Sequence, residues 1–502
     1  MISSNEERYP DWLRRRAFSN PDRLALITGG QQFTFSELDA RVDCAVDWLA
    51  SHGIAAGTHV ALHLPNSQGF VELVHGISRI GAVLVPINLR LTPEEFGWQL
   101  ADFQASHVIS ADPTDEFVAA INHQSPEPTL LAIDPHHPTW EIDAGSGCNE
   151  HVESHAPDDI HAIVYTSGTT GRPKGALLTY GNHWWSAIGS GLNLGIHADD
   201  RWMAVLPLFH VGGLSILMRS VIYGIGVVVH ESFDPDAVNR SIRKDRVTII
   251  SVVSTMLRRM LAAQPDRDYP DWLRCVLLGG GPAPQPLLEE CAGRNVPVTQ
   301  TYGLTESASQ IATLPPEDAL RKLGSAGKPL YPNEIAIEAD GRFATPGEAG
   351  EILARGPIIT AGYYRLPDAT SDAFRNGWFH TGDAGYLDAD GNLFVLDRRD
   401  DLIVTGGENV YPAEVEAMLS GYSLIEEAGV IGVPDPEWGQ RVVCVVSCAD
   451  GATPDPDAIR LWCRERLAGY KVPAEFQFIR EPLPRNAGGK LLRRTLRSWF
   501  EA

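Results

Sequence analysis

The segment Tyr165–Gly175, with the sequence YTSGTTGRPKG, contains the residue types that hold a polyphosphate. Its glycines let the backbone approach a ligand closely, its hydroxyls and N–H groups offer hydrogen bonds, and Lys174 offers a positive charge. The segment follows a run typical of a strand and precedes a helical pattern. It lacks the GxxxxGK[ST] spacing of a Walker A loop, so composition alone leaves open both a phosphate loop and a polar surface turn.

Further polar and glycine-rich segments follow in order along the chain, and together with the first they resemble the AMP-forming acyl/aryl-CoA synthetase superfamily. The resemblance covers nearly the whole chain. It implies that a carboxylate is joined to the α-phosphate of ATP and then transferred to the thiol of coenzyme A. Such a reaction gathers anions and needs cations, backbone donors and a metal ion where charge develops. The matching segments are Leu278–Pro284, Gln300–Glu306, His380–Asp383 with Tyr386, Asp397–Asp400, Gly406–Pro412 and Pro484–Lys490.

The resemblance implies an ATP site whose residues are spread over much of the chain. Tyr302 would stack on the adenine opposite a glycine wall, and Asp383 and Arg398 would bind the ribose. Outside the family, Asp383 and Arg398 would be salt-bridged surface residues and Tyr302 a buried core tyrosine. The implied ATP-binding residues are Thr166, Ser167, Gly168, Thr169, Thr170, Gly171, Lys174, Gly279, Gly280, Gly281, Tyr302, Asp383 and Arg398.

The resemblance also implies catalytic residues for two half-reactions. Glu306 would bind Mg²⁺, Thr305 would donate to the α-phosphate, and Lys490 would touch the carboxylate and the α-phosphate while the adenylate forms. His210 would lie between the acyl pocket and the channel for coenzyme A. Asp400 matches a hinge about which a small domain rotates between the two steps.

A second set of residues would serve coenzyme A. Gly406 and Gly407 would leave room for the narrow pantetheine arm, Trp438 would line its channel, and Lys471 would meet one of its phosphates. For Trp438, a core aromatic at a domain edge is the alternative interpretation.

Three segments, Thr179–Ser190, Leu208–Ser220 and Thr305–Gln310, carry a finer likeness. They most resemble the ligases that join 2-succinylbenzoate to coenzyme A in menaquinone biosynthesis. That acid has a second carboxylate on its ring, which needs a donor or a cation in the pocket. We expect Arg219 and Ser215, one helical turn apart on a helix that starts after Gly213, to supply it, with Ser307 on the opposite wall. A helix arginine whose head reaches solvent is the alternative for Arg219. Gly212 departs from the serine expected in this group.

Two other functions stay open. One is ligation of a different aryl or medium-chain acid by the same chemistry, and the other is an adenylating enzyme that loads a carrier protein supplied in trans. A silent nucleotide-binding regulator is a third class, but it would have no need for Glu306, Asp383 and Lys490 together.

Composition limits the partners. The 502 residues carry 41 Lys and Arg against 64 Asp and Glu, a net charge of −23, which argues against a general nucleic-acid binder. Seven cysteines, an odd number without a CxxC pair, favour a reducing cytoplasm over a disulfide framework. The apolar runs are too short to span a membrane. The partners expected are the acid, ATP and coenzyme A, with a homo-oligomer left open.

The elements that must position these residues alternate between short β-branched runs and helical patterns, which indicates an α/β fold with buried sheets. Segment 111–157 is weakly periodic and is predicted to be a surface excursion. After about residue 395 a new small set of elements begins. We therefore predict a large layered α/β domain over 1–397 and a small, mobile α+β domain over 398–502, joined by the hinge.

Overall fold

The computed structural model describes residues 7–140, 151–166, 173–265, 267–280, 283, 285–397, 403–410, 412–419, 421–448, 454–484 and 493–500. By its internal contacts the chain forms two compact units. The first comprises residues 1–89, 100–164 and 175–396, and the second comprises 90–99, 165–174 and 397–502. The grouping of the two short segments, 90–99 and 165–174, with the C-terminal residues was not predicted from the sequence.

A six-stranded sheet has the order β10-β9-β5-β4-β6-β7, and the pairings of β4 with β5 and β6, of β6 with β7 and of β5 with β9 are parallel. Its central strands are apolar on both faces because helices cover them, as expected for parallel sheets. The strands are β4 (His59–His63), β5 (Val83–Pro86), β6 (His107–Ser110), β7 (Thr129–Ala132), β9 (Ile160–Thr166) and β10 (Lys174–Thr179).

A second, larger sheet changes direction partway across. Strands β2, β12, β11, β13, β14 and β15 pair in parallel, whereas β15 pairs antiparallel with β16 and the strands beyond follow that pattern. The parallel half comprises β2 (Leu24–Thr28), β11 (Arg201–Ala204), β12 (Gly226–Val229), β13 (Ile249–Val253), β14 (Cys275–Gly279) and β15 (Val298–Leu304), with β3 (Gln31–Thr34) at the edge beside β2.

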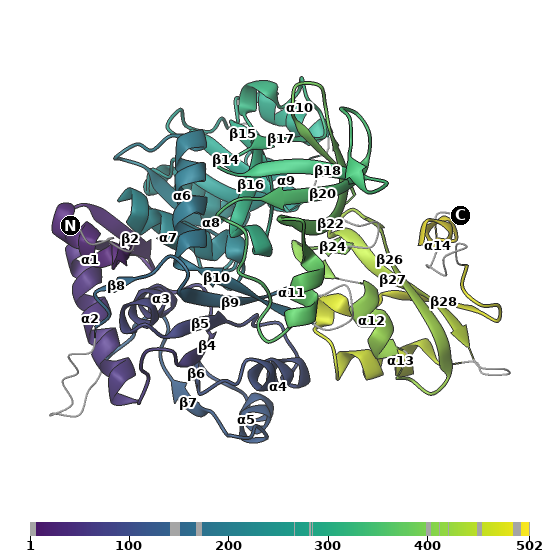
Figure 1. The fold of residues 1–502 in the computed structure, drawn as a ribbon, viewed down its shortest axis with the longest axis horizontal. Coiled ribbons are helices and arrows are strands. Elements are labelled where there is room, and N and C mark those ends of the chain that lie inside the picture. The colour runs from purple at the N-terminus through teal and green to yellow at the C-terminus, as the bar shows by residue number, and fades with distance from the viewer. Residues whose placement is uncertain are drawn as a thin grey trace. The chain divides into compact units, whose positions relative to one another are not determined.

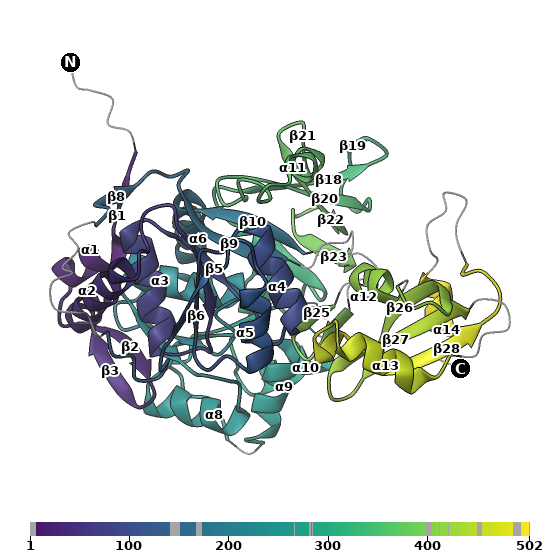
Figure 2. The ribbon, with the colours of Figure 1, turned by 90° about the horizontal axis from the view of Figure 1, so that it is seen from below.

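The later strands of the antiparallel half lie near α11 (Pro367–Ala373) in Figure 2. It begins at β16 (Ser309–Leu314), directly after the turn that carries the Thr-Glu pair. Its other strands are β17 (Ser325–Pro329), β18 (Glu334–Ala339), β19 (Arg342–Phe343), β20 (Gly350–Arg355), β21 (Phe374–Arg375), β22 (Trp378–Leu387) and β23 (Leu393–Asp397).

Helices cover the faces of both sheets (Figure 1). Several begin at a side chain that caps the free N–H groups, as Thr179 does for α6 by accepting from the Asn182 N–H at 3.0 Å. The helices outside the C-terminal region are α1 (Trp12–Ser19), α2 (Phe35–Ser51), α3 (Gln68–Ile80), α4 (Pro93–Asp102), α5 (Asp115–Asn122), α6 (Tyr180–Leu194), α7 (Val211–Tyr223), α8 (Pro235–Lys244), α9 (Ser254–Ala262) and α10 (Gln285–Gly293), and a short ladder pairs β1 (Tyr9–Pro10) with β8 (Ser154–His155).

The C-terminal region builds its own sheet, in the order β25-β24-β27-β26 with β28 paired to β27. In Figure 1 the yellow-green ribbon shows these strands with α12 and α13 packed beside them. A separate apolar cluster, which includes Val415, Val430 and Ile459, fills its core. The elements are β24 (Ile403–Thr405), β25 (Glu408–Val410), α12 (Pro412–Leu419), β26 (Ile425–Asp435), β27 (Gly439–Cys448), α13 (Pro456–Arg464), β28 (Glu475–Ile479) and α14 (Arg493–Ser498).

The predicted α/β class, with a large N-terminal part and a smaller C-terminal part, is confirmed. Two local predictions are wrong. Segment 111–157 is not only a surface excursion, because it contains α5 and β7, and β7 completes one edge of the six-stranded sheet. The helix expected after Gly213 already begins at Val211, because the glycines form its first turn instead of preceding it.

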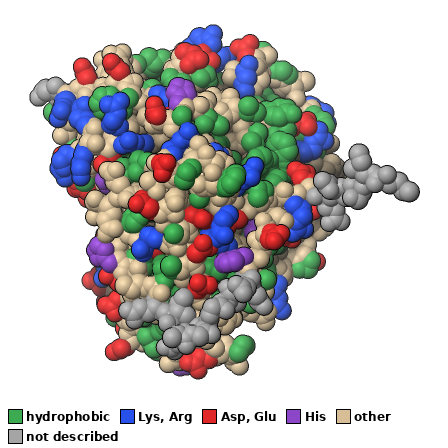
Figure 3. Space-filling view, turned by 90° about the vertical axis from the view of Figure 1, so that its left-hand side faces the viewer, with side chains coloured by type: hydrophobic (Ala, Val, Ile, Leu, Met, Phe, Trp, Pro, Cys, Tyr) green, Lys and Arg blue, Asp and Glu red, His purple; other side chains and the backbone are tan. Residues whose placement is uncertain are grey.

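Among the described residues, no helix is long and apolar enough to cross a membrane. Figure 3 shows acidic and basic side chains interspersed over one face, apart from a small group of basic ones at its upper left.

Candidate active site

Tyr302 and Asp383, two of the predicted nucleotide-binding residues, lie in contact. The Tyr302 hydroxyl donates to Asp383 Oδ2 at 2.6 Å, and both residues are buried, with exposures of 5% and 7%. The Asp383 N–H donates to Thr381 Oγ1, which fixes the strand that carries the carboxylate. Tyr302 therefore orients a carboxylate that can accept two vicinal hydroxyls, while its predicted stacking on adenine stays a prediction.

The turn after β15 presents Thr305 and Glu306. Both are only partly buried, and Glu306 Oε1 accepts a hydrogen bond from the Tyr363 hydroxyl at 2.9 Å. Ala308 and Ser309, two and three residues after Glu306, have φ values of 48° and 100°, so the turn is strained in the way that functional sites often are. A carboxylate oxygen held in place in this way is the kind of ligand that Mg²⁺ prefers.

Ser307 has a different role from the one predicted. The residue is fully buried. Its hydroxyl accepts a hydrogen bond from the Leu304 N–H at 2.9 Å and donates one to the Ser309 carbonyl at 2.8 Å. These bonds use its donor within the strained turn. Ser307 therefore holds the turn together and has no proton left to offer an acid.

The glycines predicted to face the nucleotide have a conformational reason for being glycine. Gly280 has φ +82°, and a Cβ there would lie 3.0 Å from Val253 Cγ1, whereas at Gly279 it would lie 3.3 Å from Thr301 Cγ2. A side chain at either position would press on Val253 or Thr301, so the packing of this part of the sheet itself favours glycine there.

In the predicted phosphate loop, the Thr166 hydroxyl donates to the Lys174 carbonyl at 3.3 Å, which closes the base of the segment. Several predicted residues lie outside the described residues: Ser167, Gly168, Thr169, Thr170, Gly171, Gly281, Arg398, Asp400 and Lys490.

The predicted acid-binding helix exists as α7, and His210 stands immediately before its first residue. The His210 ring packs against Phe209 with 4.4 Å between ring centroids. Ser215 is buried, and its hydroxyl donates to the Gly212 carbonyl at 3.3 Å, so it largely serves its own helix. Gly212 has room, because a Cβ there would meet only Leu206 Cδ1 at 3.5 Å.

Arg219 lies one turn beyond Ser215 and is fully inside the protein, with 1% exposure. This excludes the alternative of an arginine whose head reaches solvent. Its Nη2 donates to Ser186 Oγ at 3.1 Å, its guanidinium lies 5.3 Å from the Trp202 ring centroid, and its Nε has no hydrogen-bond partner among the described residues.

No described carboxylate pairs with Arg219, so the cation is compensated only by the neutral groups of Ser186, Trp202 and Tyr223. Burial lowers its pKa, and burial together with the Arg219 charge lowers the pKa of the neighbouring His183 to about 3. Burying an unpaired cation is expensive, which makes this position a strong attractor for an anion.

Sequence reasoning gave no role to His183 and Ser186, which interact with Arg219, or to Gln310 on β16. Gln310 is 3% exposed, and neither atom of its amide has a hydrogen-bond partner among the described residues. In the sequence, Ser186 and Ser190 are four residues apart, a helical spacing that could have indicated a polar face on α6. Gln310 ends the segment Thr305–Gln310 that carries the family resemblance, but nothing in the sequence shows that its amide is buried without partners.

The predicted residues for coenzyme A include three that meet at one hairpin. Gly406 and Gly407, with φ of +57° and +84°, form the turn between β24 and β25. The Gly406 N–H donates to the Trp438 carbonyl at 2.8 Å, and a Cβ on Gly406 would lie 2.8 Å from Trp438 Cε3. Trp438 is 52% exposed, so it is not the core aromatic of the alternative interpretation.

Lys471 has different partners from the phosphate predicted for it. Its Nζ lies 2.9 Å from Glu95 Oε1 and 2.7 Å from Glu414 Oε1, and the residue is 4% exposed. Although burial opposes it, the two carboxylates raise the pKa of Lys471, and desolvation raises the pKa of Glu414. An ammonium held this way is already neutralised, and it joins segment 90–99 to the C-terminal unit.

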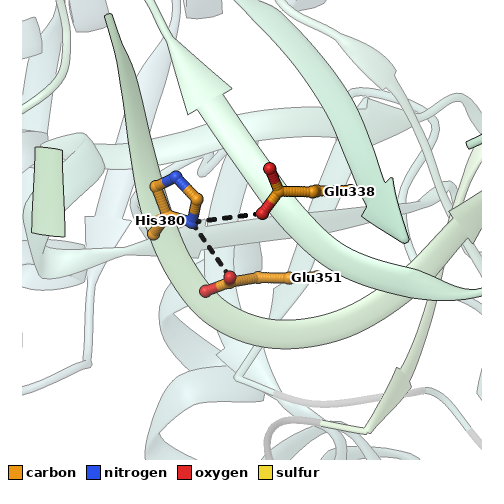
Figure 4. Close-up of side chains that lie close together, drawn as sticks. All are labelled: Glu338, Glu351 and His380. Atoms are coloured by element: carbon orange, nitrogen blue, oxygen red, sulfur yellow. Dashed lines mark hydrogen bonds and ion pairs between the residues drawn. The ribbon is translucent and has the colours of Figure 1, made fainter. Parts of the chain in front are cut away.

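A group of three possible metal ligands lies on the antiparallel half of the large sheet (Figure 4). His380 Nδ1 lies 2.9 Å from Glu351 Oε2 and 3.9 Å from Glu338 Oε2. Arg375 Nη2, at 2.7 Å from the same His380 nitrogen, already supplies a cation. The Gly382 N–H donates to Glu351 Oε1 at 3.0 Å, so the network anchors the backbone just before Asp383.

The chain matches two family descriptions in succession. Residues 13–364 match the AMP-binding enzyme family, and residues 414–490 match the AMP-binding enzyme C-terminal domain. Among curated proteins, it is 51% identical over 491 residues to a 2-succinylbenzoate–CoA ligase of Geobacillus kaustophilus, covering 97% of each chain.

Solved structures agree. One, a double mutant of o-succinylbenzoate CoA synthetase (MenE) from Bacillus subtilis bound with the product analogue OSB-NCoA, is 42% identical. It has a TM-score of 0.91 and covers 98% of this chain and 99% of that one. The same synthetase in complex with ATP and magnesium ion is 42% identical with a TM-score of 0.74, covering 98% of this chain and 100% of that one.

Proposed function

Because the chain belongs to the AMP-binding enzyme family, we propose that its buried sites serve the ligation of 2-succinylbenzoate to coenzyme A. The enzyme is an AMP-forming acid–thiol ligase, and ATP, Mg²⁺ and coenzyme A are its cofactor and co-substrates. The acid is first converted to an acyl-adenylate with release of pyrophosphate, and the thiol then displaces AMP. The free cysteines among the described residues suit a reducing cytoplasm.

Asp383, held by Tyr302, accepts the ribose hydroxyls of ATP, and Thr305 donates to the α-phosphate. Glu306 would hold Mg²⁺, which when bound neutralises the charge that develops on the phosphates. Tyr363 keeps the Glu306 carboxylate in place. Lys490 supplies the cation needed while the adenylate forms, and Gly406, Gly407 and Trp438 serve the thioester step.

The observation that carries the choice of acid is the buried, unpaired guanidinium of Arg219. An acid with a single carboxylate would present that group to ATP and leave Arg219 uncompensated in the interior. A second carboxylate on the far end of the acid removes this penalty, because each charge compensates the other. This argument favours a dicarboxylic aryl acid over the medium-chain acids that the chemistry alone would allow.

The test compares 2-succinylbenzoate with 4-oxo-4-phenylbutanoate, the same acid without its ring carboxylate. Pyrophosphate exchange and thioester formation are measured for both acids on the wild type and on Arg219→Ala. We expect the wild type to prefer the diacid strongly. The variant should lose ~2–5 kcal/mol of transition-state stabilisation on the diacid alone if the contact is direct, and less if a water bridges it.

Equal activity of the wild type on both acids would refute the assignment of a dicarboxylic substrate. An equal loss on both acids in the variant would mean that Arg219 has only a structural role. Activity confined to a carrier protein, with no dependence on coenzyme A, would instead favour the adenylating enzyme that acts in trans.

A further inference from the structure

We propose that Gln310 is the second group that recognises the ring carboxylate, beside Arg219, in the place where the sequence suggested Ser307. The inference rests on the proposed function, since it names a further specificity residue of the same pocket. Three observations carry it: the unsatisfied amide of Gln310, the face of the sheet on which it lies, and its connection to Arg219.

Among the described side chains of the large sheet, only the Gln310 amide is buried with both of its polar atoms lacking partners. Both Nε2 and Oε1 lack hydrogen-bond partners among the described residues, although the residue is only 3% exposed. A buried amide without partners destabilises a fold by roughly 1–3 kcal/mol, so such groups usually have a functional reason. Ser307 three residues earlier is fully bonded and has no such reason.

The register of the strands places Gln310 on the face covered by α6 and α7. Leu277, which packs in one cluster with the α7 residues Leu214 and Leu217, pairs with Thr299 on β15. Side chains alternate along a strand, so Gly303 shares the face of Thr299, and Gly303 pairs directly with Gln310. Tyr302 points to the opposite face, where it packs with its pair Ala312.

A chain of hydrogen bonds joins this strand to Arg219. The Arg219 Nη2 donates to Ser186 Oγ at 3.1 Å, and Ser186 Oγ donates to the carbonyl of Ala308 at 2.7 Å. Ala308 lies two residues before Gln310. Both α6 and α7 pack against β16, so the helices that carry Ser186 and Arg219 lie against the strand that carries Gln310.

The chemistry of the two groups fits a carboxylate. The unpartnered Arg219 Nε–H and the unpartnered Gln310 Nε2 hydrogens are donors, and a carboxylate offers two oxygens that only accept. Arg219 compensates the charge, while the neutral amide fixes the orientation of the ring. Gln310 Oε1 is left as an acceptor for a water that enters with the substrate.

The experiment measures kcat/KM for 2-succinylbenzoate and 4-oxo-4-phenylbutanoate on Gln310→Leu and Gln310→Glu. Hydrogen bonds to charged groups contribute about 1.5–3 kcal/mol, so Gln310→Leu should lose ~10- to 150-fold on the diacid. For 4-oxo-4-phenylbutanoate, kcat/KM should change by less than ~3-fold, because that substrate has no ring carboxylate to contact the amide. Gln310→Glu places a carboxylate beside Arg219 and should reverse the preference in favour of 4-oxo-4-phenylbutanoate.

Gln300→Leu is the matched control. Gln300 is buried to 6% exposure on the adjacent strand, and its Nε2 also lacks a partner among the described residues. Gln300 lies three residues before Gly303 on β15, where it pairs with Leu314. Because side chains alternate along a strand, it faces the other side of the sheet. Whatever activity this variant loses should be lost equally on both acids, leaving their ratio at the wild-type value.

Thermal unfolding separates recognition from folding. Removing an unsatisfied amide should leave the Tm of unliganded Gln310→Leu unchanged or raise it, whereas the increase in Tm caused by 2-succinylbenzoate should shrink. A lower Tm without ligand, or a wild-type ratio of the two acids, would overturn the role of Gln310. If the wild type itself did not distinguish the acids, the proposed function would fail instead, whatever Gln310 does.

Discussion

The hydrogen bond from Tyr302 to Asp383 offers a direct test of how the ribose is held. Tyr302→Phe removes one hydroxyl and keeps the ring, so the packing against Ile311 and Ala312 is retained. The lost bond is 2.6 Å long, ends on a carboxylate, and lies between residues that are 5% and 7% exposed. Buried hydrogen bonds to charged groups contribute about 1.5–3 kcal/mol, which corresponds to ~10- to 150-fold.

Not all of that loss has to appear in catalysis, because Asp383 can turn once it is released. The sharper measurement therefore uses ATP and 2′-deoxy-ATP in pyrophosphate exchange. If Asp383 accepts the ribose hydroxyls, the wild type discriminates against the deoxynucleotide, and Tyr302→Phe should weaken that discrimination as the carboxylate loses its orientation. The variant should mainly raise KM for ATP, since the contact exists in the ground state and the transition state alike.

Tyr363→Phe is the control with the same chemical change. It removes a hydroxyl that donates to Glu306 Oε1 at 2.9 Å, so its effect should appear as a requirement for more Mg²⁺. The ratio between ATP and 2′-deoxy-ATP should stay at the wild-type value. The reasoning would be refuted if Tyr302→Phe left that ratio unchanged, or if Tyr363→Phe altered it as much.

Lowering the pH from 7.5 to 5.5 should reduce the free energy of unfolding, because burial lowers the pKa of His75 and His183 to about 4 and about 3. Only the unfolded state takes up protons below its pKa of about 6.5, so each residue should remove ~1.4 kcal/mol by pH 5.5, and a flat profile in urea denaturation would contradict this. Gly406→Ala should place a Cβ 2.8 Å from Trp438 Cε3 and lower thioester formation while pyrophosphate exchange persists; an unaffected second step would show that this hairpin does not serve coenzyme A. Lys490→Ala should lower adenylation by ~10²-fold and spare the conversion of supplied acyl-adenylate, and equal losses in both steps would place Lys490 elsewhere in the cycle.

Much of the fold was predictable because its strands are short, apolar and β-branched. The runs at His59–Leu64 and Val247–Val253 became β4 and β13 with small changes at their ends. The start of α7 was predicted too late, because glycine in the first turn of a helix looks like a loop when only sequence is available.

The candidate site was predictable to the extent that a residue acts through its own chemistry. Asp383 and Tyr302 can each be identified from a motif, but the hydrogen bond by which Tyr302 orients a carboxylate 81 positions later cannot. Ser307 and Gln310 show the same limit in opposite directions. One hydroxyl looked available and is bonded within its turn, and one amide looked ordinary and is unsatisfied, because satisfaction depends on contacts that only the folded chain creates.

The alternation of side chains along β15 and β16 separates two kinds of change that selection, or an engineer, could make. Tyr302 and its pair Ala312 lie on one face, whereas Gly303 and its pair Gln310 lie on the other with α6 and α7. A combinatorial library confined to the second face can vary which acid is accepted without disturbing the residue that orients Asp383. Substitutions on one face of this strand pair can therefore change which acid is bound, while the residues on the other face continue to position ATP.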